Sequence, residues 1–435
     1  MNNKNSLKFL GIALLAWQGI GVDAFADNIG AEHGAIDTHC RLLAADRLFD
    51  GYDLQTNMAV LIKNQKVAQV GTRAVLAGVC ANIIDMGDAT ILPGFIESHA
   101  HISFQNVRKD TVLAHGVTTA QDTGGALLPP EGGRGQLRLL SVGPIIQAPG
   151  GYPLNIFGGT SGYDKIGYTV ASAADARSVV QHLVDGGATA IKVALEPGGE
   201  SGAPWMMPHG SNPVPATPWN ILSRRVVNAI VEEAHHPHDG RPARRVIVHA
   251  GENLGFERAL LAGVDEFAHM PCAPIDENLL AQAANTVGLT FVSTIDTLGS
   301  CVDGVTHMGI HSNTMQLATM IAECETNTPG NCAQLIYGSE IGHDNVPWGI
   351  NGEEMHMMLH LTSGASIDFG DVLNVFRAAT SKAGQRLGID KLGTLMVGAP
   401  ADVIAVRGNA IERFKLLEYP DFVMSGGRIA VNKFR

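Results

Sequence analysis

The sequence lacks the basic clusters that proteins need to bind nucleic acid. It holds 30 lysines and arginines against 42 aspartates and glutamates, and its formal net charge is −12. Neutralising phosphates requires Lys and Arg side chains gathered on one surface, and no such cluster occurs along the chain. We therefore expect no nucleic-acid partner.

Motifs of two common enzyme classes are also missing. The glycine-rich segment 198–202 lacks the Lys-Ser or Lys-Thr pair of a phosphate-binding loop. No serine nucleophile elbow is evident. Neither phosphate transfer from a nucleotide nor serine-based acyl transfer therefore has a motif in this sequence.

Long apolar runs are absent beyond residue 22, and a membrane span needs roughly 20 apolar residues. The start of the chain has a positive charge, an apolar run over 9–22, and small residues at Ala24 and Ala26. This pattern predicts a secretory signal peptide over 1–26, with a membrane anchor as the alternative. The mature protein would be periplasmic or secreted and free of the membrane.

Cysteine is scarce, with six residues and no Cys-x-x-Cys spacing, which disfavours a cysteine-only zinc site. Export would place these thiols in an oxidising compartment. Two pairs are plausible disulfides because they flank a β region and a Pro-Gly turn: Cys40 with Cys80, and Cys324 with Cys332. Six cysteines allow 15 pairings, so the sequence does not settle them. We expect Cys272 and Cys301 to be free and buried.

Apolar patterning changes twice along the chain. Short β segments fill about 38–92, and helix–glycine–strand units follow, such as a helix over 176–185, two glycines and a strand over 190–195. Such units predict a parallel sheet with crossover helices. Their number favours an α/β fold of the (β/α)8 TIM-like barrel type, with a doubly wound sheet as the alternative. Near Gly393 the pattern becomes β-like again.

These changes predict three parts after the signal peptide. A small β-sandwich domain would be formed by both chain ends, from 27–93 and 393–435. The barrel would occupy 94–392. A segment over 198–219 is rich in Pro and Gly and is long for a connection, as lids often are.

His99 and His101 are the first candidate metal ligands. Residues two apart on a strand point to the same face, so both imidazoles can bind one ion. Pro93 and Gly94 interrupt the chain just before this segment, as at a domain entry. The pair would then end the first barrel strand, where barrel enzymes place their active sites.

Three later residues follow the same logic. Lys192 lies in an otherwise apolar strand, where a charge is costly unless it is neutralised or paired. It either reaches solvent or is carbamylated by carbon dioxide to form an anion that bridges two cations. His249 and His269 also lie at predicted strand ends. Together these residues indicate a metal centre.

The segments 92–101 and 393–403, supported by 114–122 and 376–380, resemble the amidohydrolase superfamily of metal-dependent hydrolases. The resemblance covers nearly all of the mature chain. It is strongest to the branch of Xaa-Pro dipeptidases and ochratoxin-type amidases, which has a lysine in an Ile-Lys-Val strand like Lys192.

This resemblance implies two divalent metal ions, with zinc as the default for such ligands. His99 and His101 would hold one ion, and His249 and His269 the other. Lys192, as a carbamate, would bridge both.

The last ligand position departs from the family pattern. The family has Gly-Thr-Asp there, and its aspartate binds metal and shuttles the proton, whereas the matching segment 335–342 has Glu340. Glutamate carries the same group on a stem longer by about 1.5 Å. We expect Glu340 to be both metal ligand and catalytic base. Asp344 is a second candidate, and an inactive site is the third possibility.

Two further residues are candidates for substrate binding. Tyr152 follows two glycines where the family often has Gly-Gly-His, although it could instead pack under the lid. His209 lies in the 198–219 insertion and could reach the site or remain in a solvated loop.

The sequence therefore predicts an exported binuclear-metal amidohydrolase. A metal-bridging hydroxide would cleave an amide bond of a small-molecule or short-peptide substrate, such as a dipeptide or an N-acyl amino acid. The alternatives are a lactone or cyclic amide or amidine hydrolase, including a deaminase, and a non-catalytic metal-bound binding protein. A homo-oligomer is possible.

Overall fold

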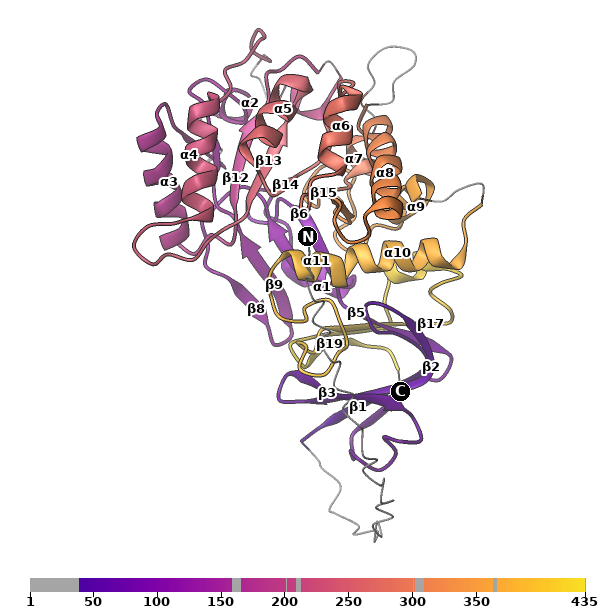
Figure 1. Ribbon diagram of the computed structural model, residues 1–435. Coiled ribbons are helices and arrows are strands. Elements are labelled where there is room, and N and C mark those ends of the chain that lie inside the picture. Colours follow the sequence, from indigo (N-terminus) through magenta and orange to yellow (C-terminus); the bar gives the residue numbers. More distant parts are fainter. Residues whose placement is uncertain are drawn as a thin grey trace, which may run out of the picture. The chain divides into compact units, whose positions relative to one another are not determined.

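The computed structural model describes residues 39–434 apart from 159–165, 201, 209–212, 300, 302–308 and 363–365. The predicted signal peptide and His209 lie outside the described residues. Within the described part, no helix combines the length and apolar character of a membrane span. Figure 1 shows how the elements are arranged.

Both ends of the described chain contribute strands to one eight-stranded sheet, with the order β19-β18-β17-β5-β1-β2-β3 and with β4 paired to β1. Antiparallel pairing of β17 with β5 joins the late strands to the early ones. The sandwich form of this part stays a prediction. The strands are β1 (Arg41–Phe49), β2 (Leu54–Lys63), β3 (Lys66–Thr72), β4 (Ile83–Asp85), β5 (Ala89–Pro93), β17 (Val403–Arg407), β18 (Phe422–Ser425) and β19 (Arg428–Asn432).

The segment between these ends forms two further sheets, ordered β6-β7-β9-β8 and β11-β10-β12-β13-β14-β15-β16. Every pair in them is parallel except β8 with β9. The predicted parallel arrangement is therefore confirmed. The strands are β6 (Phe95–Ala100), β7 (Val117–Asp122), β8 (Glu131–Gly133), β9 (Gln136–Ser141), β10 (Ile145–Gln147), β11 (Gly167–Thr169), β12 (Ile191–Leu195), β13 (Val246–Ala250), β14 (Glu266–Phe267), β15 (Thr290–Val292) and β16 (Gln334–Ile336).

From β10 to β16, helices alternate with the strands and cover them (Figure 1). All residues of β12 and β13 are buried, and their sequences are apolar apart from Lys192 and His249. The helices are α1 (Lys109–Ala114), α2 (Leu154–Phe157), α3 (Ala173–Asp185), α4 (Arg224–His235), α5 (Glu252–Ala262), α6 (Glu277–Ala284), α7 (Ile295–Leu298), α8 (Gly309–Asn327), α9 (Gly352–Thr362), α10 (Phe369–Ala379) and α11 (Ser381–Arg386), with 3-10 turns η2 (Pro204–Met206) and η3 (Phe414–Glu418).

Glycine directly follows α3 and α5, as the sequence pattern predicted, whereas α1 and α6 have His115 and Asn285 in that position. After α5, Gly263 adopts a left-handed conformation with φ of 77°, and its backbone N–H donates back to the last turn. A residue with a side chain would be strained there, so the glycine fixes where the chain leaves the helix. The next strand, β14, follows within three residues.

Three disulfides tie the chain, and one of them corrects an expectation. Cys40–Cys80 and Cys324–Cys332 are bonded as predicted. The expectation that Cys272 and Cys301 are free is wrong, because they form the third disulfide with Cα atoms 6.0 Å apart. No local turn links two residues 29 positions apart. Only the fold, which brings the segments after β14 and α7 together, could reveal this pair.

The third disulfide predicts the thiol content of the protein. In denaturant without reductant, a thiol reagent should detect no free cysteine, and after reduction it should detect six. Two thiols before reduction, located at Cys272 and Cys301 by peptide mapping, would show that this pair is not bonded.

Candidate metal centre

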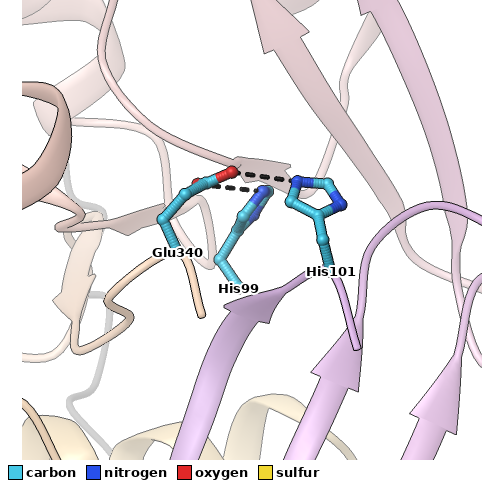
Figure 2. Close-up of side chains that lie close together, drawn as sticks. All are labelled: His99, His101 and Glu340. Carbon is cyan, nitrogen blue, oxygen red and sulfur yellow. Dashed lines mark hydrogen bonds and ion pairs between the residues drawn. The ribbon is translucent and has the colours of Figure 1, made fainter. Parts of the chain in front are cut away.

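His99 and His101 come from the end of β6, and Glu340 comes from the segment after β16 (Figure 2). The Oε1 atom of Glu340 lies 2.9 Å from His101 Nε2, and its Oε2 atom lies 3.3 Å from His99 Nε2. The carboxylate therefore faces both imidazoles at once. This is the strand-end pair that the two-residue spacing predicted, joined by the carboxylate expected beside it.

The backbone holds Glu340 in an unusual conformation. Its φ is 64°, in the left-handed region that non-glycine residues rarely adopt. Its N–H donates to His99 O at 3.0 Å, and Ile341 O accepts from His101 N–H at 2.7 Å. Such conformations cost about 1–3 kcal/mol and concentrate at functional sites. No sequence pattern indicates this conformation.

The buried carboxyl group of Glu97 links the segment that carries His99 to the segment that carries Glu340. Glu97 accepts hydrogen bonds from His99 N at 2.8 Å, Ser339 N at 2.9 Å and Ser339 Oγ at 2.7 Å. Burial raises the pKa of Glu97 to about 8. Glu97 therefore positions the backbone on both sides of the cluster, although sequence reasoning did not single it out.

Lys192, His249 and His269 line the same cavity as the first three residues. In the parallel register of β12 and β13, Ala194 lies opposite His249. Lys192 is therefore two residues before the position opposite His249 and points to the same face of the sheet as Ala194. His269 Nε2 lies 2.8 Å from His249 Nδ1. The structure thus brings together all six residues predicted as metal ligands.

The ionisation states suit metal binding. Burial lowers the pKa of His249 and His99 well below the usual value, that of His269 to about 4 and that of Lys192 to about 7. Burial alone would raise the pKa of Glu340, but His99 and His101 outweigh it and hold that pKa well below its usual range. At neutral pH the imidazoles of His99, His249 and His269 are therefore uncharged and the Glu340 carboxylate is ionised, as metal ligands must be.

The donor set fits a divalent ion. One ligand atom from each of His99, His101 and Glu340 can be chosen so that all lie within 4.8 Å of one another. Glu340 Oε2 is buried without a hydrogen-bond partner. Imidazole nitrogen with carboxylate oxygen is a usual zinc donor set. His249 and His269 offer two further imidazole nitrogens in the same cavity.

The cavity over these residues has a volume of about 110 Å³. Tyr152 lines it and stacks on His249, with ring centroids 4.7 Å apart. Asp344 is exposed, and it is not among the described residues that line the cavity. Of the two candidate bases, the structure therefore places only Glu340 beside the histidines.

Trp205 is a cavity residue that sequence reasoning missed. Its ring stacks on His269 at 5.0 Å and meets His249 edge-on at 4.8 Å. It belongs to η2, inside the Pro- and Gly-rich insertion that was expected to be a lid. The length of that insertion was the only available signal.

Glu196 is the second missed residue. It follows β12 directly, it is buried, and its Oε2 lies 3.3 Å from His249 Nε2, the ring nitrogen that faces away from His269. Gly198 N–H donates to its Oε1 at 2.6 Å. A Cβ at Gly251 would lie 2.1 Å from Glu196 Oε2, so only glycine leaves room for this contact. Carboxylates that hold the second nitrogen of a ligand histidine tune metal affinity.

Glu196→Ala is expected to weaken any metal binding by His249 about 10- to 100-fold, because His249 loses the group that orients its ring. Competition with a chelator would measure the affinity. Glu257→Ala removes an exposed carboxylate from α5 and serves as the matched control. Equal affinities of the Glu196→Ala and control proteins would contradict the role of Glu196.

Comparisons with known proteins identify the family and the fold. The model of the family described as "Amidohydrolase family" matches residues 90–430. Among curated protein sequences, none matches this chain.

Solved structures share the fold. A Xaa-Pro dipeptidase with methionine bound in its active site superposes with a TM-score of 0.62 at 20% identity, over 90% of this chain and 99% of the other. The ochratoxinase of A. niger gives 0.64 at 18% identity, over 91% and 96%. A putative prolidase from Bifidobacterium longum gives 0.64 at 22% identity, over 90% and 94%.

Proposed function

The chain belongs to the amidohydrolase family, and we propose that it is a binuclear metal-dependent hydrolase that cleaves an amide bond of a small substrate. The observation that carries this proposal is the convergence of four histidines, Lys192 and Glu340 on one cavity. A dipeptide or an N-acyl amino acid is the proposed substrate class. The amide-cleaving relatives named above support that choice.

Six side chains would hold the ions. His99, His101 and Glu340 form one set, and His249 with His269 form the other. Lys192, once carbamylated, would bridge them. Bound divalent ions, which we propose to be zinc, would polarise the substrate carbonyl and make the attacking water more acidic.

The chain's own residues perform the remaining tasks. Glu340 accepts a proton from the attacking water and delivers it to the leaving nitrogen, which is general acid–base catalysis. Tyr152 and Trp205 form aromatic walls beside His249 and His269. We propose that these walls pack against the substrate.

The parallel strands are proposed to form a closed TIM-like barrel. The hydrogen bonds from Glu340 to His99 and from His101 to Ile341 support closure, because they join the segment after β16 to β6. The fold shared with amidohydrolases supports the same reading. Closure would place all six ligands at the carboxyl ends of strands, where barrel active sites lie.

Export is the proposed route to a periplasmic or secreted location. Three disulfides support an oxidising compartment. Cleavage after Ala26 would give a mature protein that begins at Asp27. Sequencing the amino terminus of protein recovered from the exported fraction tests this, and an intact terminus in the cytoplasm would contradict it.

A hydrolysis screen of zinc-loaded protein tests the substrate class. Dipeptides, N-acyl amino acids, lactones and cyclic amides should be compared at equal concentration. We expect turnover of the linear amides. Activity confined to lactones or cyclic amides would replace the proposed class, and no activity in metal-loaded protein would favour a binding role.

A further inference from the structure

Helix α9 carries two histidines that face each other, separate from the cavity. His356 and His360 are one helical turn apart, and their Nε2 atoms lie 3.0 Å from each other. Residues four apart on a helix share one face. Both imidazoles are accessible, since His360 is exposed and the side chain of His356 is 42% exposed. Neither residue lines the cavity.

The spacing of the two nitrogens suits a shared metal ion. Imidazole binds zinc at 2.0–2.1 Å, so two nitrogens on one ion lie roughly 3 Å apart. The rings therefore need little rearrangement to bind. In the metal-free protein one imidazole donates a hydrogen bond to the other, and an incoming ion would replace that proton.

A carboxylate fixes the orientation of this pair. Glu353 Oε2 lies 3.3 Å from His356 Nδ1, the nitrogen that faces away from His360. The other oxygen of Glu353 pairs with Lys415 on η3, which restrains the carboxylate. This arrangement of carboxylate, histidine and open nitrogen is the one that supports ligand histidines in metal sites.

Helix α8 adds a third histidine nearby. His311 lies on α8, which packs against α9, and burial together with His360 lowers the pKa of His311. The region therefore gathers imidazoles from two helices, and two of them already face each other at ligand spacing.

We propose that His356 and His360 form a surface site for one transition-metal ion that prefers imidazole, such as Ni²⁺, Cu²⁺ or Zn²⁺, independent of the catalytic centre. Water would fill the remaining coordination positions. Ions with high imidazole affinity should bind best, with Cu²⁺ the tightest of the three. The site would add a third metal equivalent to the chain under metal excess.

Calorimetric titration with Ni²⁺ tests this site in the full mature protein, after the catalytic centre is loaded with zinc and free zinc is removed. Wild-type protein should bind one equivalent of Ni²⁺. His356→Ala and His360→Ala should each weaken that binding at least tenfold and leave amide hydrolysis unchanged. His238→Ala removes another exposed histidine and should bind Ni²⁺ like the wild type.

Two results would overturn the proposal. One is that the wild type binds no Ni²⁺, and the other is that the His356→Ala and His360→Ala variants bind Ni²⁺ as tightly as the wild type. Circular dichroism melting curves that match the wild type would show that the variants are folded. Since α9 variants leave the cavity ligands intact, failure of this site is distinguishable from failure of the catalytic proposal.

Discussion

Glu340→Gln is expected to lower kcat about 10²- to 10⁴-fold, the usual contribution of a positioned acid–base group. The amide keeps the shape of the side chain but cannot take a proton from water. One carboxylate oxygen is replaced, so zinc affinity should fall as well, and the assay needs zinc in excess. Turnover and bound metal should be measured on the same preparation.

Asp344→Asn is the discriminating partner of that variant. Asp344 is exposed beyond the cavity, so its amide variant should retain wild-type kcat. If Asp344→Asn lost turnover and Glu340→Gln did not, the proton shuttle would have been assigned to the wrong residue. Unchanged turnover in both variants would show that neither Glu340 nor Asp344 acts as the catalytic base.

Lys192→Met should have a comparably large effect. Methionine fills a similar volume without an amine, so the carbamate bridge cannot form. Metal content is expected to fall from two ions to one or none. Because a metal ion acting as a Lewis acid contributes several kcal/mol, kcat should fall by about 10³-fold or more. Lys66→Met removes an exposed lysine on β3 and provides the control.

The pKa of Lys192 adds a pH dependence to this prediction. Only an uncharged amine reacts with carbon dioxide, and burial lowers the pKa of Lys192 to about 7. Reactivation of metal-free protein by zinc should therefore require a source of carbon dioxide and, at equal concentrations of dissolved carbon dioxide, proceed faster at pH 8 than at pH 6. Reactivation that is equally fast without bicarbonate would argue against a carbamate.

The sequence predicted those parts of the site that follow from local periodicity. His99 and His101 share a face because strand residues alternate. Lys192 stood out because a charged residue interrupts an apolar strand. Glycines after helices indicated where strands begin, and the parallel sheets are confirmed.

Features that depend on long-range packing were not predictable. Glu196 contacts His249 across 53 positions only because Gly251 leaves space for the carboxylate. Cys272 and Cys301 meet through the fold and not through a turn. Trp205 lies in an irregular insertion, where no periodicity reveals which side chain reaches a cavity.

The departure at the last ligand position has a structural counterpart. Glutamate is longer than the aspartate of the family pattern, and Glu340 takes a left-handed backbone conformation. Glu340 nonetheless reaches within hydrogen-bonding distance of His101 and lies close to His99. The longer side chain therefore does not by itself prevent Glu340 from acting as a ligand.

Metal content measured together with amide hydrolysis tests the central claim most directly. The His360→Ala background avoids a contribution from α9. After reconstitution with zinc and bicarbonate and removal of free metal, we predict two zinc ions per chain and amide hydrolysis that chelation abolishes and zinc restores. A chain that binds no zinc after this treatment, or that hydrolyses amides equally well without metal, would contradict the account.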